Sequence, residues 1–262
     1  MELGLRGKRA LVMGASKGLG RAIAEALAAD GAALAISGRE VERLRPVCEA
    51  LTGMGATAAH PFAADVAKGE DMDALAEGAM AALGGLDILV LNHGGPPAGT
   101  AADLTEEALE TWFRRIVLSP VRMANKVLPA MRAQGFGRII AVGSTGMVQP
   151  LPNLALSNVL RANIVGWAKT LADEVGPDGV TVNIIAPGAI RTDRSIELAG
   201  AAASKQGKTP EQVIADREKT IPMRRYGTPE EFGRAAAFLA SDAGSYITGT
   251  ILRVDGGVVR GF

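Results

Sequence analysis

Short apolar runs alternate along the chain with longer segments in which apolar residues recur every three or four positions. The short runs have the length and composition of buried β-strands, and the longer segments have the periodicity of amphipathic helices. Parallel strands need crossover helices that cover both faces of their sheet. The alternation therefore predicts an α/β fold, a single-domain Rossmann-type doubly wound parallel seven-stranded sheet with helices on both faces. The expected strands cover about 9–15, 32–37, 56–63, 86–92, 137–144, 180–188 and 250–257, and the expected helices about 18–30, 40 onward, 68–83, 104–133, 154–175 and 228–240.

Two places interrupt this pattern. Residues 193–222 are polar and predict a small helical lid over one end of the sheet, with an ordinary surface insertion as the alternative. Ligands of open α/β sheets bind beyond the carboxyl ends of the strands, where such a lid would close. Pro120 lies inside the helix expected over 104–133 and predicts a kink there. No linker, repeat or low-complexity tract divides the chain, so residues 1–262 are expected to form one domain.

The composition narrows the classes of function. Hydrophobic residues make up 48% of the 262 positions, which is enough for a sizeable core, and 28 basic residues balance 28 acidic ones. We therefore expect neither nucleic acid nor a membrane surface as a partner. Cys48 is the only cysteine, and His60 and His93 are the only histidines, so we expect no disulfide and no metal site. The N-terminus lacks a signal-peptide pattern, which favours a cytoplasmic protein.

The segment "GASKGLG" (14–20) joins the first expected strand to the first expected helix. Its glycines, Gly14, Gly18 and Gly20, permit a tight turn in which backbone amides approach a pyrophosphate at the positive end of the helix. A turn needed only for helix–strand packing is the alternative. The position between an N-terminal strand and a helix favours a dinucleotide site.

The end of the second expected strand indicates which dinucleotide binds. Ser37, Gly38 and Arg39 stand where an acidic residue would bind the adenosine 2′-hydroxyl of NAD(H). Arg39, together with Lys17 in the glycine turn, is suited to a 2′-phosphate, and no carboxylate is present there to repel it. The sequence favours NADP(H) as the cofactor and leaves NAD(H) open. A solvated Arg39 that contacts no ligand is the alternative.

These features resemble the single-domain short-chain dehydrogenases/reductases over residues 6–257, most closely the 3-oxoacyl-[acyl-carrier-protein] reductase-like group. The glycine turn matches the family's cofactor turn, "NHGG" (92–95) resembles its Asn-Asn-Ala-Gly loop beside the ribose, and "PGAIRT" (187–192) resembles its loop at the nicotinamide carboxamide. The resemblance implies one NAD(P)-binding domain. The cofactor-binding residues that it implies are Gly14, Ser16, Lys17, Gly18, Leu19, Gly20, Arg39, Asp65, Val66, Asn92, Gly94, Pro187, Gly188, Ile190 and Thr192.

The catalytic positions depart from the family's pattern of an Asn, a Ser, a Tyr and a Lys, in which the Tyr is the general acid or base. Ser144, at the end of "RIIAVGS", matches the serine. Ser157 stands at the place of the tyrosine, Arg161 at that of the lysine and Ile116 at that of the asparagine. The expected catalytic residues are therefore Ser144, Ser157 and Arg161. The last two are four positions apart, so they share one face of the helix expected over 154–175.

These substitutions change what the site can do. A neighbouring cation brings the pKa of a phenol within reach of neutral pH, but a serine hydroxyl is a poor proton donor and a guanidinium keeps its proton. Tyr226 and Tyr246 lie far from this helix in the sequence. Arg161 can still hold ribose hydroxyls, stabilise an oxyanion or bind a substrate carboxylate or phosphate. By its ordinary pKa, His93 is the side chain best suited to replace the missing acid, but a structural hydrogen bond is the favoured role of a lone histidine.

Three functions follow from this site. The favoured one is an NADP(H)-dependent oxidoreductase of the carbonyl reductase or alcohol dehydrogenase type, in which water or another side chain donates the proton. The alternatives are a catalytically inactive NADP(H)-binding sensor or subunit and a non-redox lyase or isomerase on the same fold. The expected partners are a small carbonyl or alcohol substrate and copies of the chain itself. Apolar faces on the helices over 104–133 and 154–175 favour a homotetramer, with a dimer as the alternative.

Overall fold

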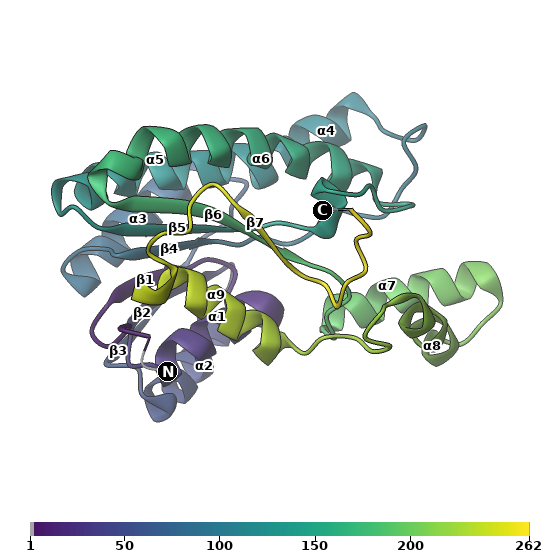
Figure 1. Cartoon of the computed structure of the whole chain (residues 1–262), viewed down its shortest axis with the longest axis horizontal. Helices are drawn as coiled ribbons and strands as arrows, with labels where there is room; N and C mark the ends of the chain where they lie inside the picture. The colour runs from purple at the N-terminus through teal and green to yellow at the C-terminus, as the bar shows by residue number, and fades with distance from the viewer. Residues whose placement is uncertain (1–2, 262) are drawn as a thin grey trace.

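All strands of the sheet run parallel. The computed structural model describes residues 3–261, and the strand order is β3-β2-β1-β4-β5-β6-β7 (Figure 1). The order reverses between β1 and β4, which places a crevice at the carboxyl ends of these strands. The predicted doubly wound sheet of seven strands is confirmed, although most strands end earlier than predicted. The strands are β1 (Arg9–Val12), β2 (Ala33–Gly38), β3 (Ala58–Ala63), β4 (Ile88–Leu91), β5 (Gly137–Val142), β6 (Val180–Pro187) and β7 (Ile251–Val254).

Two layers of helices cover the sheet, one on each face (Figure 1). Successive strand residues point to opposite faces: Leu11 belongs to the core shared with α3, α5 and α6, and Val12 to the core shared with α1, α2 and α9. Burial on both faces explains why the strands are continuous apolar runs rather than alternating ones. The helices that surround the sheet are α1 (Gly18–Ala29), α2 (Val41–Met54), α3 (Gly69–Leu83), α4 (Glu106–Phe113), α5 (Ser119–Ala133), α6 (Ala155–Val175) and α9 (Pro229–Ala240).

The helix predicted over 104–133 runs without a break from Glu106 to Ala133, but it is not α-helical throughout. A π-helical segment, Arg114–Leu118, separates α4 from α5, and the N–H of Ser119 donates to the carbonyl of Arg114, five residues earlier. Pro120 follows directly and has no N–H to donate to Ile116, four residues earlier, so it stands in the first turn of α5. The π turn directly before Pro120 contains Ile116, the residue at the family's asparagine position, and the kink expected at Pro120 stays a prediction.

Residues 193–222 form a helical hairpin beyond the carboxyl end of β6, at the right of Figure 1. It consists of α7 (Asp193–Gln206) and α8 (Pro210–Thr220), which pack on each other. Two contacts link α7 to the rest of the protein. Arg194 Nη2 donates to the Pro96 carbonyl at 3.0 Å, and Lys17 Nζ lies 3.4 Å from the carboxylate of Asp193. The helical nature of this segment is confirmed, and its role as a lid stays a prediction.

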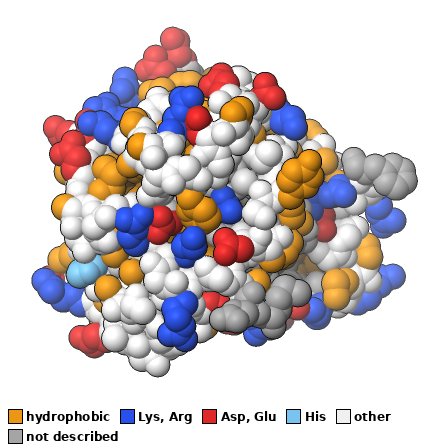
Figure 2. All heavy atoms as spheres, turned by 60° about the vertical axis from the view of Figure 1, so that its left-hand side comes forward, with side chains coloured by type: hydrophobic (Ala, Val, Ile, Leu, Met, Phe, Trp, Pro, Cys, Tyr) orange, Lys and Arg blue, Asp and Glu red, His pale blue; other side chains and the backbone are white. Residues whose placement is uncertain are grey.

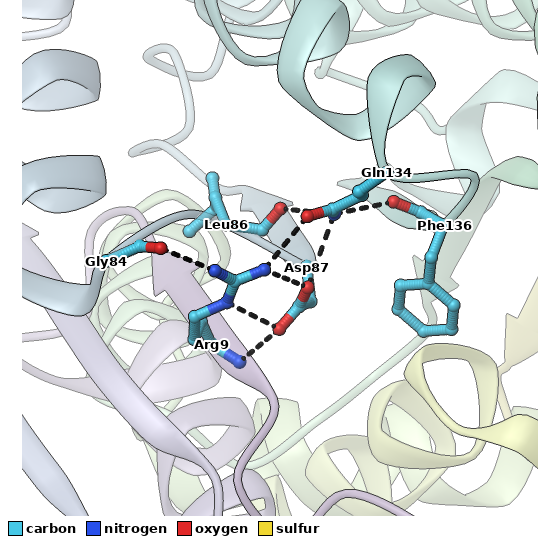
Figure 3. A network of polar contacts seen from close by, with 6 residues as sticks. All are labelled: Arg9, Gly84, Leu86, Asp87, Gln134 and Phe136. Atoms are coloured by element: carbon cyan, nitrogen blue, oxygen red, sulfur yellow. Dashed lines mark hydrogen bonds and ion pairs between the residues drawn. The ribbon is translucent and has the colours of Figure 1, made fainter.

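A network of polar contacts joins β1, β4 and the turn after α5 at the amino edge of the sheet (Figure 3). The Arg9 guanidinium donates to both carboxylate oxygens of Asp87, at 2.9 and 2.6 Å, to the Gly84 carbonyl at 2.6 Å and to the Gln134 side chain at 2.9 Å. Burial acts to raise the pKa of Asp87, but the hydrogen bonds from Arg9 hold that pKa below its usual value. The network fixes β1 against β4 at the edge remote from the predicted site.

Basic, acidic and hydrophobic side chains are interspersed on the face shown in Figure 2. Among residues 3–261, no helix is long and apolar enough to cross a membrane. Within the same range, no group of three or more His, Cys, Asp or Glu side chains is placed to hold a metal ion.

Candidate active site

The predicted site residues gather at one edge of the sheet. Because the strands are parallel, their carboxyl ends share an edge. The glycine turn follows β1, Arg39 follows β2, Asp65 and Val66 follow β3, Asn92 and Gly94 follow β4, Ser144 follows β5, and the loop 187–192 follows β6. The fold therefore brings together residues that are up to about 180 positions apart in the sequence.

The glycine turn after β1 is shaped to receive a phosphate group. Gly14 and Gly18 have φ angles of 60° and 62°, which favour glycine. A Cβ atom at Gly20 would overlap the Gly14 carbonyl oxygen, so glycine is required for this close approach. Asn92 Nδ2 supports the turn by donating to the carbonyls of Met13 and Gly14, at 3.1 and 3.2 Å. No side chain caps the amino end of α1, so its first N–H groups remain available to a pyrophosphate.

The two cations predicted to bind a 2′-phosphate differ in availability. Arg39 is exposed directly beyond β2 and forms no side-chain hydrogen bond or ion pair with another residue in the range 3–261. Lys17 instead points to α7, where its Nζ lies 3.4 Å from the Asp193 carboxylate. Both partners of that pair are exposed, so the pair is weak. Arg39 is thus the better placed of the two for a 2′-phosphate.

The loops predicted to hold the two ends of the cofactor are fixed by contacts of their own. Asp65 Oδ1 accepts the backbone N–H two residues later at 2.9 Å, which sets the turn after β3. Thr192 caps α7, with its Oγ1 accepting the N–H of Ser195 at 3.3 Å. A Cβ atom at Gly188 would lie 2.6 Å from that of Asp255, so a glycine is required where this loop passes the C-terminal tail. The contacts of these residues with a cofactor stay predictions.

Ser144 lies two residues beyond β5 and precedes a short 3₁₀ turn, Thr145–Met147. Its Oγ accepts a hydrogen bond from the N–H of Gly146 at 3.1 Å. Since that bond uses an oxygen lone pair, the hydroxyl hydrogen remains free to be donated. Ser144 can therefore orient a substrate carbonyl, the role that the resemblance implies.

Helix α6 carries the two altered positions into the interior. The side chains of Ser157 and Arg161 lie one turn apart, and the residues are only 8% and 7% exposed. Arg161 Nη1 donates at 2.6 Å to the carbonyl of Val142, the last residue of β5. This bond joins the guanidinium to the strand that leads into Ser144. Burial lowers the pKa of Arg161 to about 10, so the guanidinium is still protonated at neutral pH.

His93 follows β4 and lies in the field of Arg161. Burial, together with repulsion from Arg161, lowers the pKa of His93 to about 3. Its Nδ1 lies 2.9 Å from the Gly94 carbonyl oxygen, which can only accept, so Nδ1 carries the hydrogen and Nε2 the lone pair. With Nδ1 bonded to Gly94, His93 has the geometry of the structural role, and its role as a proton donor stays a prediction.

The tyrosines do not replace the phenol either. Tyr246 is fully exposed after α9. Tyr226 lies between α8 and α9, where burial raises its pKa and the nearby charges are those of Arg191, Arg217 and Glu218. Within residues 3–261, neither tyrosine side chain forms a hydrogen bond with α6.

Asn158 is a site residue that no pattern in the sequence marked. It follows Ser157 on α6, and its side-chain amide forms two hydrogen bonds with the backbone of Leu151, in the loop after Ser144. Its Oδ1 accepts the N–H of Leu151 at 3.3 Å, and its Nδ2 donates to the carbonyl of Leu151 at 2.9 Å. The clamp positions the loop that would cover a substrate. The Val142 carbonyl was missed for a similar reason, since a backbone acceptor has no sequence signal.

A parallel doubly wound sheet with a glycine turn at its first crossover defines a nucleotide-binding α/β protein. The profile of the enoyl-(acyl carrier protein) reductase family matches residues 14–259. The uncharacterised oxidoreductase YvrD of Bacillus subtilis strain 168 is 34% identical over 264 residues, which cover 99% of each chain. The chain belongs to the short-chain dehydrogenase/reductase family.

Two further relatives bear on the kind of reductase. The 3-oxoacyl-[acyl-carrier-protein] reductase FabG of Aquifex aeolicus is 32% identical over 267 residues, covering 98% of this chain and all of the relative (100%). The crystal structure of L-sorbose reductase from Gluconobacter frateurii, complexed with NADPH and L-sorbose, has a TM-score of 0.95 and 34% identity over 100% of both chains. These likenesses confirm the resemblance to the 3-oxoacyl-[acyl-carrier-protein] reductase-like group and an oxidoreductase of the short-chain type.

Proposed function

We propose that this protein is an NADP(H)-dependent carbonyl reductase, or the corresponding alcohol dehydrogenase, in which Ser144, Ser157 and Arg161 act on the substrate oxygen. The glycine turn carries this proposal. It has the required glycines and an uncapped helix end, and it opens on the same edge of the sheet as Ser144. The unpaired Arg39 supports a 2′-phosphate, and a structural neighbour of 34% identity is complexed with NADPH.

A bound nicotinamide would supply the hydride, and the residues of the chain would act on the developing oxyanion. Ser144 donates its free hydroxyl hydrogen to that oxygen, and Ser157 offers a second hydroxyl from α6. Arg161, anchored on Val142, stabilises the negative charge without giving up its proton. Water takes the part of the missing phenol as the proton donor, since a serine hydroxyl is a poor acid and the guanidinium keeps its proton.

The proposal also includes the oligomeric state of the protein and its place in the cell. Three large apolar side chains are exposed on the helices that the sequence assigned to an interface: Phe113, Leu118 and Val159. Burying them between copies supports a homotetramer, with a dimer as the alternative. The substrate is a small molecule, and the protein acts in the cytoplasm.

Restoring the family's residues tests the chemistry. The Ser157→Tyr/Arg161→Lys double variant regains a phenol beside an ammonium group. We expect it to oxidise NADPH about 10²–10⁴ times faster than the natural protein on a panel of acyl thioesters, oxo acids and aldehydes. The Ser157→Phe/Arg161→Lys variant fills the same space without a hydroxyl and should show no gain.

NADPH binding, followed by fluorescence, separates this proposal from the alternatives. Tight binding with no turnover by the natural protein or the double variant supports a non-catalytic NADP(H)-binding protein instead. Absence of nucleotide binding excludes both the reductase and the sensor, and leaves a non-redox reaction.

A further inference from the structure

Arg161 is a buried cation whose charge is not balanced by the protein. The residue is 7% exposed, and the hydrogen bond to Val142 is the one that its side chain forms within the range 3–261. In that range, no carboxylate raises its pKa, which burial alone lowers. A buried charge is costly unless it is paired, so a ligand that pairs with Arg161 would recover part of that cost.

The free donors of Arg161 exceed what a cofactor can use. A guanidinium has five N–H donors, and the Val142 carbonyl takes one of them. Ribose hydroxyls, the partners of the lysine in relatives, would take about two more and bring no charge. Two donors and the whole positive charge then remain. That remainder matches a carboxylate, which binds a guanidinium through two parallel hydrogen bonds.

The surroundings of Arg161 favour a singly charged ligand. Ser157, one turn earlier, has no side-chain hydrogen bond within the described chain, and it is smaller than a tyrosine by a phenol ring. It therefore offers a free hydroxyl on the same helix face as the guanidinium. His93 is neutral, so it adds no second positive charge. One positive charge is balanced by one carboxylate rather than by a doubly charged phosphate.

We propose that Arg161 determines substrate specificity and that this site takes an oxo acid or hydroxy acid, whose carboxylate pairs with the guanidinium while Ser144 binds the reacting oxygen. The identity of the reaction rests on the proposed reductase function. The carboxylate site itself does not depend on hydride transfer.

Binding of an unreactive oxo-acid analogue tests the site without turnover. Oxamate is titrated at neutral pH, with and without NADPH, and the imidazole ¹⁵N signals are followed by NMR. The chain has two histidines, so His93 reports on the site and His60 serves as the reference. His60 lies on the edge strand β3, three places from β4 in the sheet. We expect oxamate to shift the His93 signals and to leave those of His60 in place.

Matched ligands and variants identify the contact. Ethyl oxamate, the neutral ester, should leave the His93 signals unshifted. The Arg161→Met variant keeps the apolar stem and should bind oxamate about 100-fold more weakly, since the carboxylate loses its charged partner. Arg161→Lys keeps the charge without the planar fork and should weaken oxamate binding about 10-fold.

Several results would overturn the inference. Equal shifts with oxamate and its ester, or undiminished oxamate affinity in Arg161→Met, would show that the guanidinium does not bind the carboxylate. Tighter binding of inorganic phosphate than of oxamate would assign the site to phosphorylated substrates. Oxamate binding through Arg161 without any NADPH binding supports the carboxylate site but ends the reductase proposal. Reduction of uncharged carbonyls that oxamate does not affect supports the reductase proposal but ends the proposal of a carboxylate site.

Discussion

Two arginines at opposite edges of the same sheet show how differently a fold can treat a guanidinium. Arg9 opens β1 at the amino edge, and its guanidinium donates four hydrogen bonds, two of them to the Asp87 carboxylate (Figure 3). Arg161 lies at the carboxyl edge, where its guanidinium donates one hydrogen bond to the Val142 carbonyl. The completed network stabilises the fold, and the incomplete one has donors left for a ligand.

The electrostatics of the two arginines differ in the same way. The side-chain hydrogen bonds that Arg9 donates to Asp87 raise the pKa of Arg9, whereas burial lowers that of Arg161. Arg161 also acts on a neighbour, because its charge helps to keep His93 neutral. Unbalanced charge and an altered pKa are common features of functional sites. The carboxyl edge of the sheet has both.

The largest expected difference is between the stabilities of two variants in which one arginine is replaced by methionine. This pair of variants tests the comparison most directly. Arg9→Met leaves the Asp87 carboxylate, 11% exposed, without its cation, and we expect the free energy of unfolding to fall by about 3 kcal/mol. Arg161→Met removes an unbalanced buried charge as well as a hydrogen bond. The two effects oppose each other, so the change should stay within about 1 kcal/mol. Urea unfolding measures both, and equal losses would contradict the distinction.

Gln134→Ala sharpens the account of the amino edge with a smaller effect. Gln134 accepts from Arg9 and donates to the carbonyls of Leu86 and Phe136. Its removal should lower the free energy of unfolding by about 1–2 kcal/mol, because the ion pair beside it is kept. Asn163→Ala is the control, since its side chain is exposed and bonds only the Val159 carbonyl of its own helix. A loss as large as that in Arg9→Met would mean that Gln134, rather than Asp87, holds Arg9.

At neutral pH, His93→Gln has the smallest effect of these variants, because it changes stability only under acidic conditions. An unfolded histidine takes up a proton near pH 6.5, whereas the folded pKa of His93 is about 3. Between these values, protons bind the unfolded chain preferentially, so the stability of the natural protein falls as the pH falls from about 6.5. The Asp87 carboxylate, whose pKa is also lowered, adds to this loss only around and below its ordinary value of 3.8.

We therefore expect His93→Gln to lose stability less steeply than the natural protein between about pH 6 and pH 4, with no difference at pH 7.5. Unfolding curves at several pH values measure this. His60→Gln controls for the removal of a histidine elsewhere. Parallel pH profiles of the natural protein and His93→Gln would show that folding does not lower the pKa of His93.

The strands, the helices and most of the cofactor edge were open to prediction from sequence. Burial on both faces makes the strands continuous apolar runs, and the helices between them keep a helical period, so each element has a local signal. The glycine turn has one too, since Gly14 and Gly18 adopt φ angles that other residues avoid. The π turn before Pro120 was foreseen only as a kink, because hydrogen bonds to the fifth residue back leave no distinct pattern.

The sequence by itself determined which residue types stand at the catalytic positions, since counting along the chain places Ser144, Ser157 and Arg161. Only the tertiary structure decided what surrounds them. The Val142 carbonyl that anchors Arg161 is a backbone group, and the loss of the proton on His93 comes from burial beside a cation 68 positions away. The identity of a residue does not encode backbone hydrogen-bond acceptors, desolvation or the electric field of a distant residue. They exist only once the chain has folded.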